Sequence, residues 1–136
     1  MVRPICKDIF FLNQKAKPAT KADLPVAQDL IDTLRANADR CVGMAANMIG
    51  VNKRIIVVAF GPFPVIMMNP VIVSRSGSYQ AEEGCLSLDG QRTATRYETI
   101  EVEFQDMSMK RQKQTYSGFT AQIIQHEIDH CEGILI

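Results

Sequence analysis

The sequence predicts an α+β protein whose mostly antiparallel sheets pack around a C-terminal, metal-binding helix. Three observations support this class: an apolar helical repeat near each end, short β-rich segments between them, and 46% hydrophobic residues among 136. With 22% charged residues, the composition is typical of a globular protein rather than a disordered one. Because no repeat or linker divides the chain, residues 1–136 are expected to form a single domain.

The first expected helix covers residues 24–38. Asp23 and Pro25 stand where a helix would begin. Its apolar side chains follow the i, i+3, i+4, i+7 spacing of an amphipathic helix, at Ala27, Leu30, Ile31, Leu34 and Ala38.

The middle of the chain predicts strands. Residues 54–60 and 70–73 are β-branched and short, as in buried strands, and residues 93–97 and 113–116 are weaker candidates. Residues 99–105 alternate between apolar and polar, which predicts a sheet with one solvated face. The apolar positions of this segment are Ile100, Val102 and Phe104.

The second expected helix covers residues 119–132 and ends at Gly133. It contains an H-E-x-x-H sequence, and His126 and His130 are the only two histidines of the chain. Residues four apart lie on one helix face, so both imidazoles can bind one ion, with Glu127 able to reach a water beside it.

A catalytic site of this kind needs a third protein ligand, and no histidine remains to supply it. Cys131 and Glu132 are too close in sequence to turn back to the same ion. A carboxylate or thiolate from upstream must therefore complete the site, and Cys85, in a small-residue turn, is the best candidate. An upstream ligand argues against an ordinary zinc peptidase.

Charge and cysteine content narrow the possible functions. Fifteen basic residues balance fifteen acidic ones, which disfavours a direct nucleic-acid or anionic-membrane partner. No apolar run approaches the roughly 18–20 residues of a membrane span. The four scattered cysteines predict a reduced, soluble, cytoplasmic protein, in which Cys6 and Cys41 are expected to be plain buried thiols.

Three segments together resemble the peptide deformylase family, which removes the N-formyl group from nascent bacterial proteins. Residues 41–50, CVGMAANMIG, are similar to the motif G-φ-G-φ-A-A-x-Q-φ-G, where φ is apolar. Residues 83–87 keep E-G-C-L-S, and residues 125–130 keep Q-H-E-x-D-H. The resemblance covers essentially the whole chain.

The resemblance implies a role for each residue of the site. Cys85, His126 and His130 would hold a divalent metal, Fe2+ in the cell and replaceable by Zn2+, Ni2+ or Co2+. Glu127 would act as general base and then as general acid, while the backbone N–H of Leu86 would face the developing oxyanion.

The same resemblance implies how the substrate binds. The formyl-Met peptide would lie as an added strand between Val42-Gly43 and Gly84. Its methionine pocket would be lined partly by Val42, Phe119, Ile123 and His126. Asp129 and Arg92 would form a buried pair near the site, or else be an ordinary helix acid and a surface arginine. A transient association with the ribosome is also expected.

The chain departs from the family pattern at several positions. Cys41 replaces a glycine, Asp89 stands where proline is frequent, and the chain stops at Ile136 without a further helix, as in short forms from Gram-positive bacteria. Met48 replaces the glutamine whose amide donates to the formyl oxygen, and the loss of one such donor typically costs on the order of 10²–10³ in rate.

The leading interpretation is therefore a metal-dependent hydrolase that removes the N-formyl group from formyl-Met, with activity reduced by Met48. The alternative is a non-catalytic, metal-containing binder of formylated or free peptide N-termini. A general zinc endopeptidase is disfavoured by the upstream thiolate.

Overall fold

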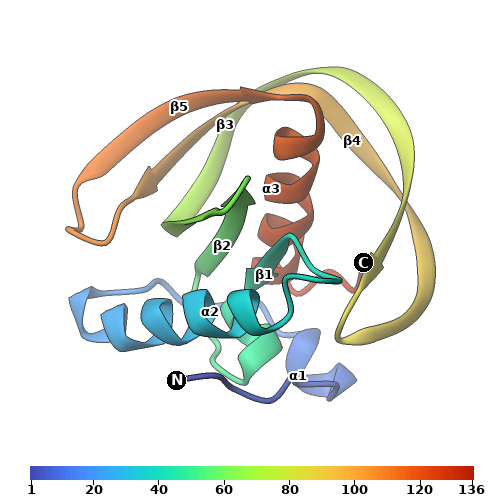
Figure 1. Cartoon of the computed structure of the whole chain (residues 1–136). Coiled ribbons are helices and arrows are strands. Elements are labelled where there is room, and N and C mark those ends of the chain that lie inside the picture. Colours follow the sequence, from blue (N-terminus) through green and yellow to red (C-terminus); the bar gives the residue numbers. More distant parts are fainter.

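A computed structural model describes all 136 residues of the chain (Figure 1). It contains three α-helices and two short 3-10 helices, which are α1 (Ile9–Leu12), η1 (Lys21–Asp23), α2 (Leu24–Ala36), η2 (Ala46–Ile49) and α3 (Gly118–Cys131). The strands are β1 (Gly43–Ala45), β2 (Ile55–Phe60), β3 (Phe63–Cys85), β4 (Leu88–Gln105) and β5 (Arg111–Ser117). None of the helices has the length and apolar character needed to cross a bilayer.

The five strands form one antiparallel sheet in the order β1-β2-β3-β4-β5. The predicted α+β class is confirmed, and the strands join into a single sheet. In Figure 1 the long, bent strands β3 and β4 curve around α3, while α2 lies below β1 and β2.

Strand β2 is buried on both faces, which explains why its sequence is a continuous apolar run rather than an alternating one. Ile55 and Val57 pack into a core shared with α2. Ile56 and Val58 pack into a second core shared with α3. The sheet is therefore covered by a helix on each face at this point.

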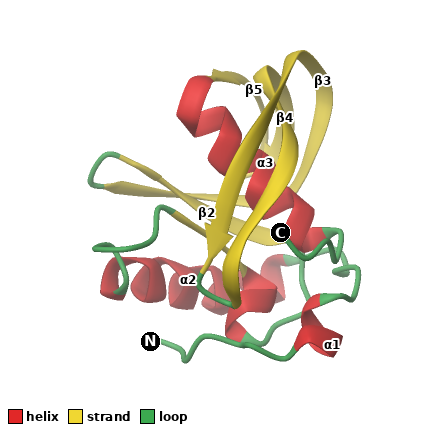
Figure 2. Cartoon of the chain, turned by 90° about the vertical axis from the view of Figure 1, so that its right-hand side faces the viewer, coloured by secondary structure: helices red, strands yellow, loops and turns green.

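Strands β3 and β4 are longer than the sequence predicts because each joins segments that look separate. The expected strand at residues 70–73 is the middle of β3, and residues 93–97 and 99–105 are both parts of β4. Three register shifts interrupt the β3–β4 pairing, between Met68 and Val71, between Ile72 and Ser74, and between Gly84 and Cys85. Such irregularities let a strand bend, and in Figure 2 both strands curve over α3.

The helix boundaries agree with the sequence to within two residues. Helix α2 ends at Ala36, so the predicted last residue Ala38 lies beyond it. Helix α3 is followed by Gly133, whose φ of +75° is the left-handed conformation of a helix C-terminus. A Cβ at this position would lie 2.6 Å from the carbonyl oxygen of Asn13, so no larger residue fits.

Candidate metal centre

Helix α3 places both histidines in the interior of the protein. His126 and His130 are one turn apart, and their Nε2 atoms are 3.1 Å from each other. His130 is completely buried, and burial lowers its pKa to about 3. Its imidazole is therefore neutral near pH 7, which is the form that binds a metal ion.

Cys85 completes the group from the end of β3. Its Sγ lies 3.4 Å from His130 Nε2, and the ligand atoms of Cys85, His126 and His130 all lie within 4.8 Å of one another. Tetrahedral ligands at usual Zn–N and Zn–S lengths are about 3.3 Å (N···N) and about 3.6 Å (N···S) apart. The three residues therefore fit a four-coordinate metal ion with one open position.

The outer nitrogen of His126 is held by a carboxylate. His126 Nδ1 lies 2.8 Å from Glu83 Oε1 on β3. A hydrogen bond of this kind fixes the orientation of a metal-binding imidazole. Burial raises the pKa of Glu83, but hydrogen bonds from His126, Arg96 and Gln122 outweigh it and lower the pKa to about 2.

Arg96 on β4 binds two acids and is itself 3% exposed. Its guanidinium donates to Glu83 Oε1 at 2.7 Å and to Asp129 Oδ2 at 2.6 Å. The predicted partner of Asp129, Arg92, is thus the wrong arginine: Arg92 donates to the backbone oxygen of Asp89 at the hairpin end. Four residues further along β4, Arg96 is the one whose side chain reaches α3.

Glu127 is buried beside the two histidines. Burial raises its pKa to about 7, so the carboxyl group can both accept and donate a proton near neutral pH. Its Oε1 is buried and has no hydrogen-bond partner in the protein.

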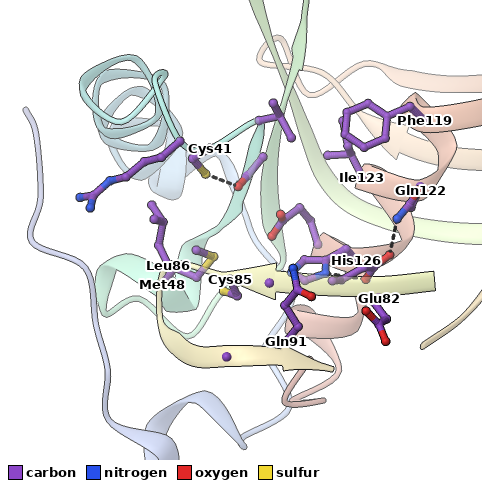
Figure 3. Close-up of a pocket in the computed structure, with 17 residues that line it drawn as sticks. Cys41, Met48, Glu82, Cys85, Leu86, Gln91, Phe119, Gln122, Ile123 and His126 are labelled. Atoms are coloured by element: carbon purple, nitrogen blue, oxygen red, sulfur yellow. Dashed lines mark hydrogen bonds and ion pairs between the residues drawn. The ribbon is translucent and has the colours of Figure 1, made fainter. Parts of the chain in front are cut away.

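A pocket of about 550 Å³ opens in front of this group (Figure 3). The predicted substrate-binding residues all line it, namely Val42, Gly43, Gly84, Phe119 and Ile123. Leu86, predicted to face the oxyanion through its backbone N–H, lines it as well. A Cβ at Gly43 would lie 2.7 Å from Ile123 Cγ2 and 3.0 Å from Glu127 Oε2, so only glycine lets β1 pass this close to α3.

Met48 also lines the pocket, although it is 1% exposed. Its Sδ accepts a hydrogen bond from the Ala45 N–H at 3.5 Å. The side chain carries no donor, so it cannot contribute a hydrogen bond to an oxygen in the pocket.

Glu83 and Arg96 are functional residues that sequence reasoning missed in these roles. Glu83 enters the sequence analysis only as part of the E-G-C-L-S segment, with no role of its own. Extending the alternation of Ile100, Val102 and Phe104 backwards in steps of two reaches Arg96, which marks it as an inward position. The same step also reaches Arg92, so the pattern alone does not choose between them.

The fold and this donor set define the class of metal-dependent hydrolases that carry their general base and two ligands on one helix. The sequence profile of the family described as polypeptide deformylase matches residues 3–136. The chain therefore belongs to the polypeptide deformylase family, hydrolases that use a catalytic divalent metal and remove the N-formyl group from nascent polypeptides.

Named relatives and solved structures agree with this assignment. The chain is 59% identical to the peptide deformylase of Clostridium beijerinckii over the full length of both. It is 38% identical to that of Dictyoglomus thermophilum, over 92% of this chain and 83% of the relative. A peptide deformylase structure from Legionella pneumophila superposes with a TM-score of 0.89 at 35% identity, over 99% of this chain and 83% of that one.

A further structure is of direct interest for the pocket. It is a class I type b peptide deformylase from Acinetobacter baumannii bound to Met-Ala-Ser, with a TM-score of 0.89 and 30% identity, covering 99% of this chain and 97% of that chain.

Proposed function

We propose that this chain removes the formyl group from N-terminal methionine with Cys85, His126 and His130 as metal ligands and Glu127 as the proton-transfer group. The observation that carries the proposal is the convergence of those three ligand atoms within 4.8 Å, next to a buried glutamate and beside a pocket that Cys85, His126 and Glu127 line. Fe2+ is proposed as the metal in the cell, with Zn2+, Ni2+ or Co2+ able to replace it.

When bound, a divalent metal would supply Lewis-acid activation of the attacking water and of the formyl oxygen. Glu127 accepts the proton of the attacking water, because its pKa of about 7 keeps a useful fraction ionised. The same carboxyl group then donates that proton to the leaving amine. The backbone N–H of Leu86 would stabilise the oxygen as negative charge develops.

The peptide is proposed to bind as an additional strand. Strand β1 is the end of the sheet order, and β2 is the only strand that pairs with it, so a peptide could add at its other edge. Val42 and Gly43 would supply backbone groups on this side, and Gly84 would supply them on the other. That the Acinetobacter relative was crystallised with Met-Ala-Ser supports a short peptide as the ligand of this chain.

The methionine side chain would contact Val42, Phe119 and Ile123. Val42 is 43% exposed and Phe119 is 64% exposed, although both are apolar and both line the pocket. Covering such side chains with an apolar substrate group is favourable by about 25 cal/mol per Å² buried.

Met48 makes this chain a slower deformylase than a relative with glutamine at the same position. With no donor at residue 48, the chain's own stabilisation of the oxygen would rest on the Leu86 N–H.

We further propose that the chain works in the cytoplasm, where its four free cysteines stay reduced. Residues 1–136 would act there as a single domain. This domain would associate transiently with the ribosome.

The direct test is formate release from formyl-Met-Ala-Ser by protein loaded anaerobically with Fe2+ or Ni2+. The isosteric Glu127→Gln variant is the control, since it keeps the shape of the pocket and removes the base. Formate release above this control is expected. Equal rates for the two proteins would refute the proposal.

The non-catalytic interpretation receives no support from the named relatives, all of which are peptide deformylases. A general endopeptidase would digest an unfolded protein substrate, and we expect the metal-loaded chain to leave such a substrate intact.

A further inference from the structure

One charged side chain at the mouth of the pocket has no role in the chemistry described above. Arg40 is the only lysine or arginine among the pocket-lining residues, and it is exposed. No carboxylate lies within ion-pair distance of its guanidinium. The pocket therefore presents one unpaired positive charge to whatever enters it.

The position of Arg40 is fixed from the end of α2. Its Nη2 donates to Asn37 Oδ1 at 3.0 Å, and its backbone N–H donates to the Asn37 carbonyl at 3.0 Å. Asn37 is buried and donates in turn to the Thr33 carbonyl at 2.8 Å. A guanidinium held in this way loses little further freedom when it binds an anion, and its remaining N–H groups are free.

The geometry also sets the direction of the bound peptide. A Cβ at Gly43 would lie 3.0 Å from Glu127 Oε2, so this end of the 40–43 segment passes beside the proposed general base, and Arg40 is at the other end of the segment. A peptide with its formyl group at the metal centre must therefore run antiparallel to residues 40–43. Residues 40–42 are the turn and bend that lead into β1, so the peptide residues after the methionine pass Cys41 and approach Arg40. With the methionine beside Val42, the third peptide residue is the one that we place nearest the Arg40 guanidinium.

The other charged group at the rim is Glu82 on β3. Figure 3 shows Glu82 and Cys41, the neighbour of Arg40, on opposite sides of the pocket. Glu83 is already neutralised by Arg96, and Glu127 is buried beside the histidines. An acidic side chain at the third peptide residue would therefore meet Arg40 without a nearby competing carboxylate.

We propose that Arg40 is a specificity-determining residue that binds an acidic side chain at the third residue of the formylated peptide. This inference rests on the proposed deformylase function. It predicts that N-termini with Asp or Glu at this position are processed faster than those with a neutral or basic residue.

The test uses four-residue, C-terminally amidated peptides, so that no terminal carboxylate can imitate the acidic side chain. Formyl-Met-Ala-Asp-Ala-amide is compared with its Asn and Lys counterparts on the metal-loaded enzyme. We expect kcat/KM to be about two- to fivefold higher for Asp than for Asn, as for an exposed ion pair, and lower still for Lys. The preference should shrink in high salt.

Arg40→Gln should bring the Asp-to-Asn ratio to about one, and Arg40→Glu should make Lys the preferred residue. Arg35→Gln is the matched control, because Arg35 is an exposed arginine of α2 that does not line the pocket. This variant should keep the wild-type ratio. An Asp preference that survives Arg40→Gln would overturn the inference, as would equal rates for the three peptides.

The affinities of the deformylated products Met-Ala-Asp-Ala-amide and Met-Ala-Asn-Ala-amide are measured in parallel by calorimetry. These affinities test whether Arg40 binds the acidic side chain even if the chain releases no formate. Tighter binding of the Asp product, lost in Arg40→Gln, supports the inference, and equal affinities overturn it. Absence of formate with every peptide would refute only the proposed deformylase function.

Discussion

Met48 is the single residue expected to have the largest effect on rate. The side chain faces a pocket in which a hydrogen-bond donor would be useful, yet its sulfur accepts a bond from the Ala45 N–H. A glutamine could use Oε1 to accept the same bond and leave Nε2 free to donate to the formyl oxygen. We therefore expect Met48→Gln to raise kcat by about 10²- to 10³-fold.

The matched control is Met48→Leu, which has similar volume and also lacks a donor. Formate release from formyl-Met-Ala-Ser is measured for both variants with the same metal. A gain in Met48→Gln but not in Met48→Leu assigns the effect to the amide. If neither variant gains, the pocket does not need a donor at this position.

Cys41 occupies another position where the chain departs from the family motif, and its thiol is expected to be inert. Burial, with a further contribution from the negative charge of Glu127, raises the pKa of Cys41 to about 12. Its S–H donates to the Gly43 carbonyl at 2.9 Å. At pH 8 its thiolate is too scarce to react quickly, even after allowing for the higher nucleophilicity of a basic thiolate.

We predict that iodoacetamide labels Cys41 roughly 50-fold more slowly than a free cysteine at pH 8. Labelling is followed by mass mapping of the peptide that contains Cys41, and the rate should keep rising up to about pH 11. A rate equal to that of free cysteine, or one that levels off near pH 9, would contradict the raised pKa.

At the scale of secondary-structure elements, one ionic network joins β3, β4 and α3. Glu83, Arg96 and Asp129 come from these three elements in that order, and Glu83 also holds the His126 ring. Removing one partner from a buried ion pair leaves an uncompensated charge, which costs about 3–5 kcal/mol. Arg96→Met should lower the free energy of unfolding by this amount and also weaken metal binding.

Arg92→Met provides a matched control on the same strand, because the Arg92 side chain donates to the Asp89 carbonyl and forms no ion pair. Its effect should stay within about 0.5 kcal/mol. Both variants are compared by urea unfolding and by titration with Ni2+. Equal destabilisation by the two substitutions would show that the network does not stabilise the fold.

The same network predicts a dependence of stability on pH. The pKa of Glu83 is about 2 in the folded protein, below its ordinary value of 4.5. A depressed carboxyl pKa stabilises the fold above the unfolded value, and this stabilisation is lost as pH falls from about 4.5 towards 2. In chelator-treated protein, Glu83→Gln should flatten the slope of unfolding free energy in this range. An unchanged slope would exclude Glu83 as its source.

At the scale of the whole molecule, the sequence predicts local features better than long-range ones. Both ligands on α3 follow from a five-residue motif, and the inward face of β4 follows from its alternation at Ile100, Val102 and Phe104. The full length of β3 cannot be predicted in this way. Residues 74–78 are polar and contain Gly77, which is a composition typical of a turn. Their strand conformation depends on pairing with β4, a long-range interaction.

Long-range structure also explains why Arg96, and not Arg92, pairs with Asp129. The two arginines are four residues apart on β4, so the strand alternation places both on the same face. Arg92 is also the residue that pairs with Glu83 in the β3–β4 register. Only the curvature of the hairpin around α3 determines which guanidinium reaches Asp129. The sequence therefore predicts the three residues that we propose as metal ligands, and the three-dimensional path of the sheet determines which residues support them.

The metal centre also connects distant parts of the chain, so its occupancy should affect the stability of the whole fold. Cys85 comes from β3 and both histidines from α3, and a ligand that binds only the folded state stabilises it by RT ln(1 + [L]/Kd). At a thousandfold excess over Kd this is about 4 kcal/mol. For a protein of this size, the expected rise in Tm is about 10–20 °C.

Tm is measured by calorimetry with Ni2+ and with a chelator. The increase should disappear in Cys85→Ser, because a hydroxyl group binds the ion far more weakly than a thiolate. Cys6→Ser is the matched control, since Cys6 is another half-buried free cysteine outside the ligand group, and this variant should keep the full increase. A metal-dependent Tm that persists in Cys85→Ser would show that the ion is held elsewhere. Because both variants lose one thiol, only a site that includes Cys85 predicts different results for them.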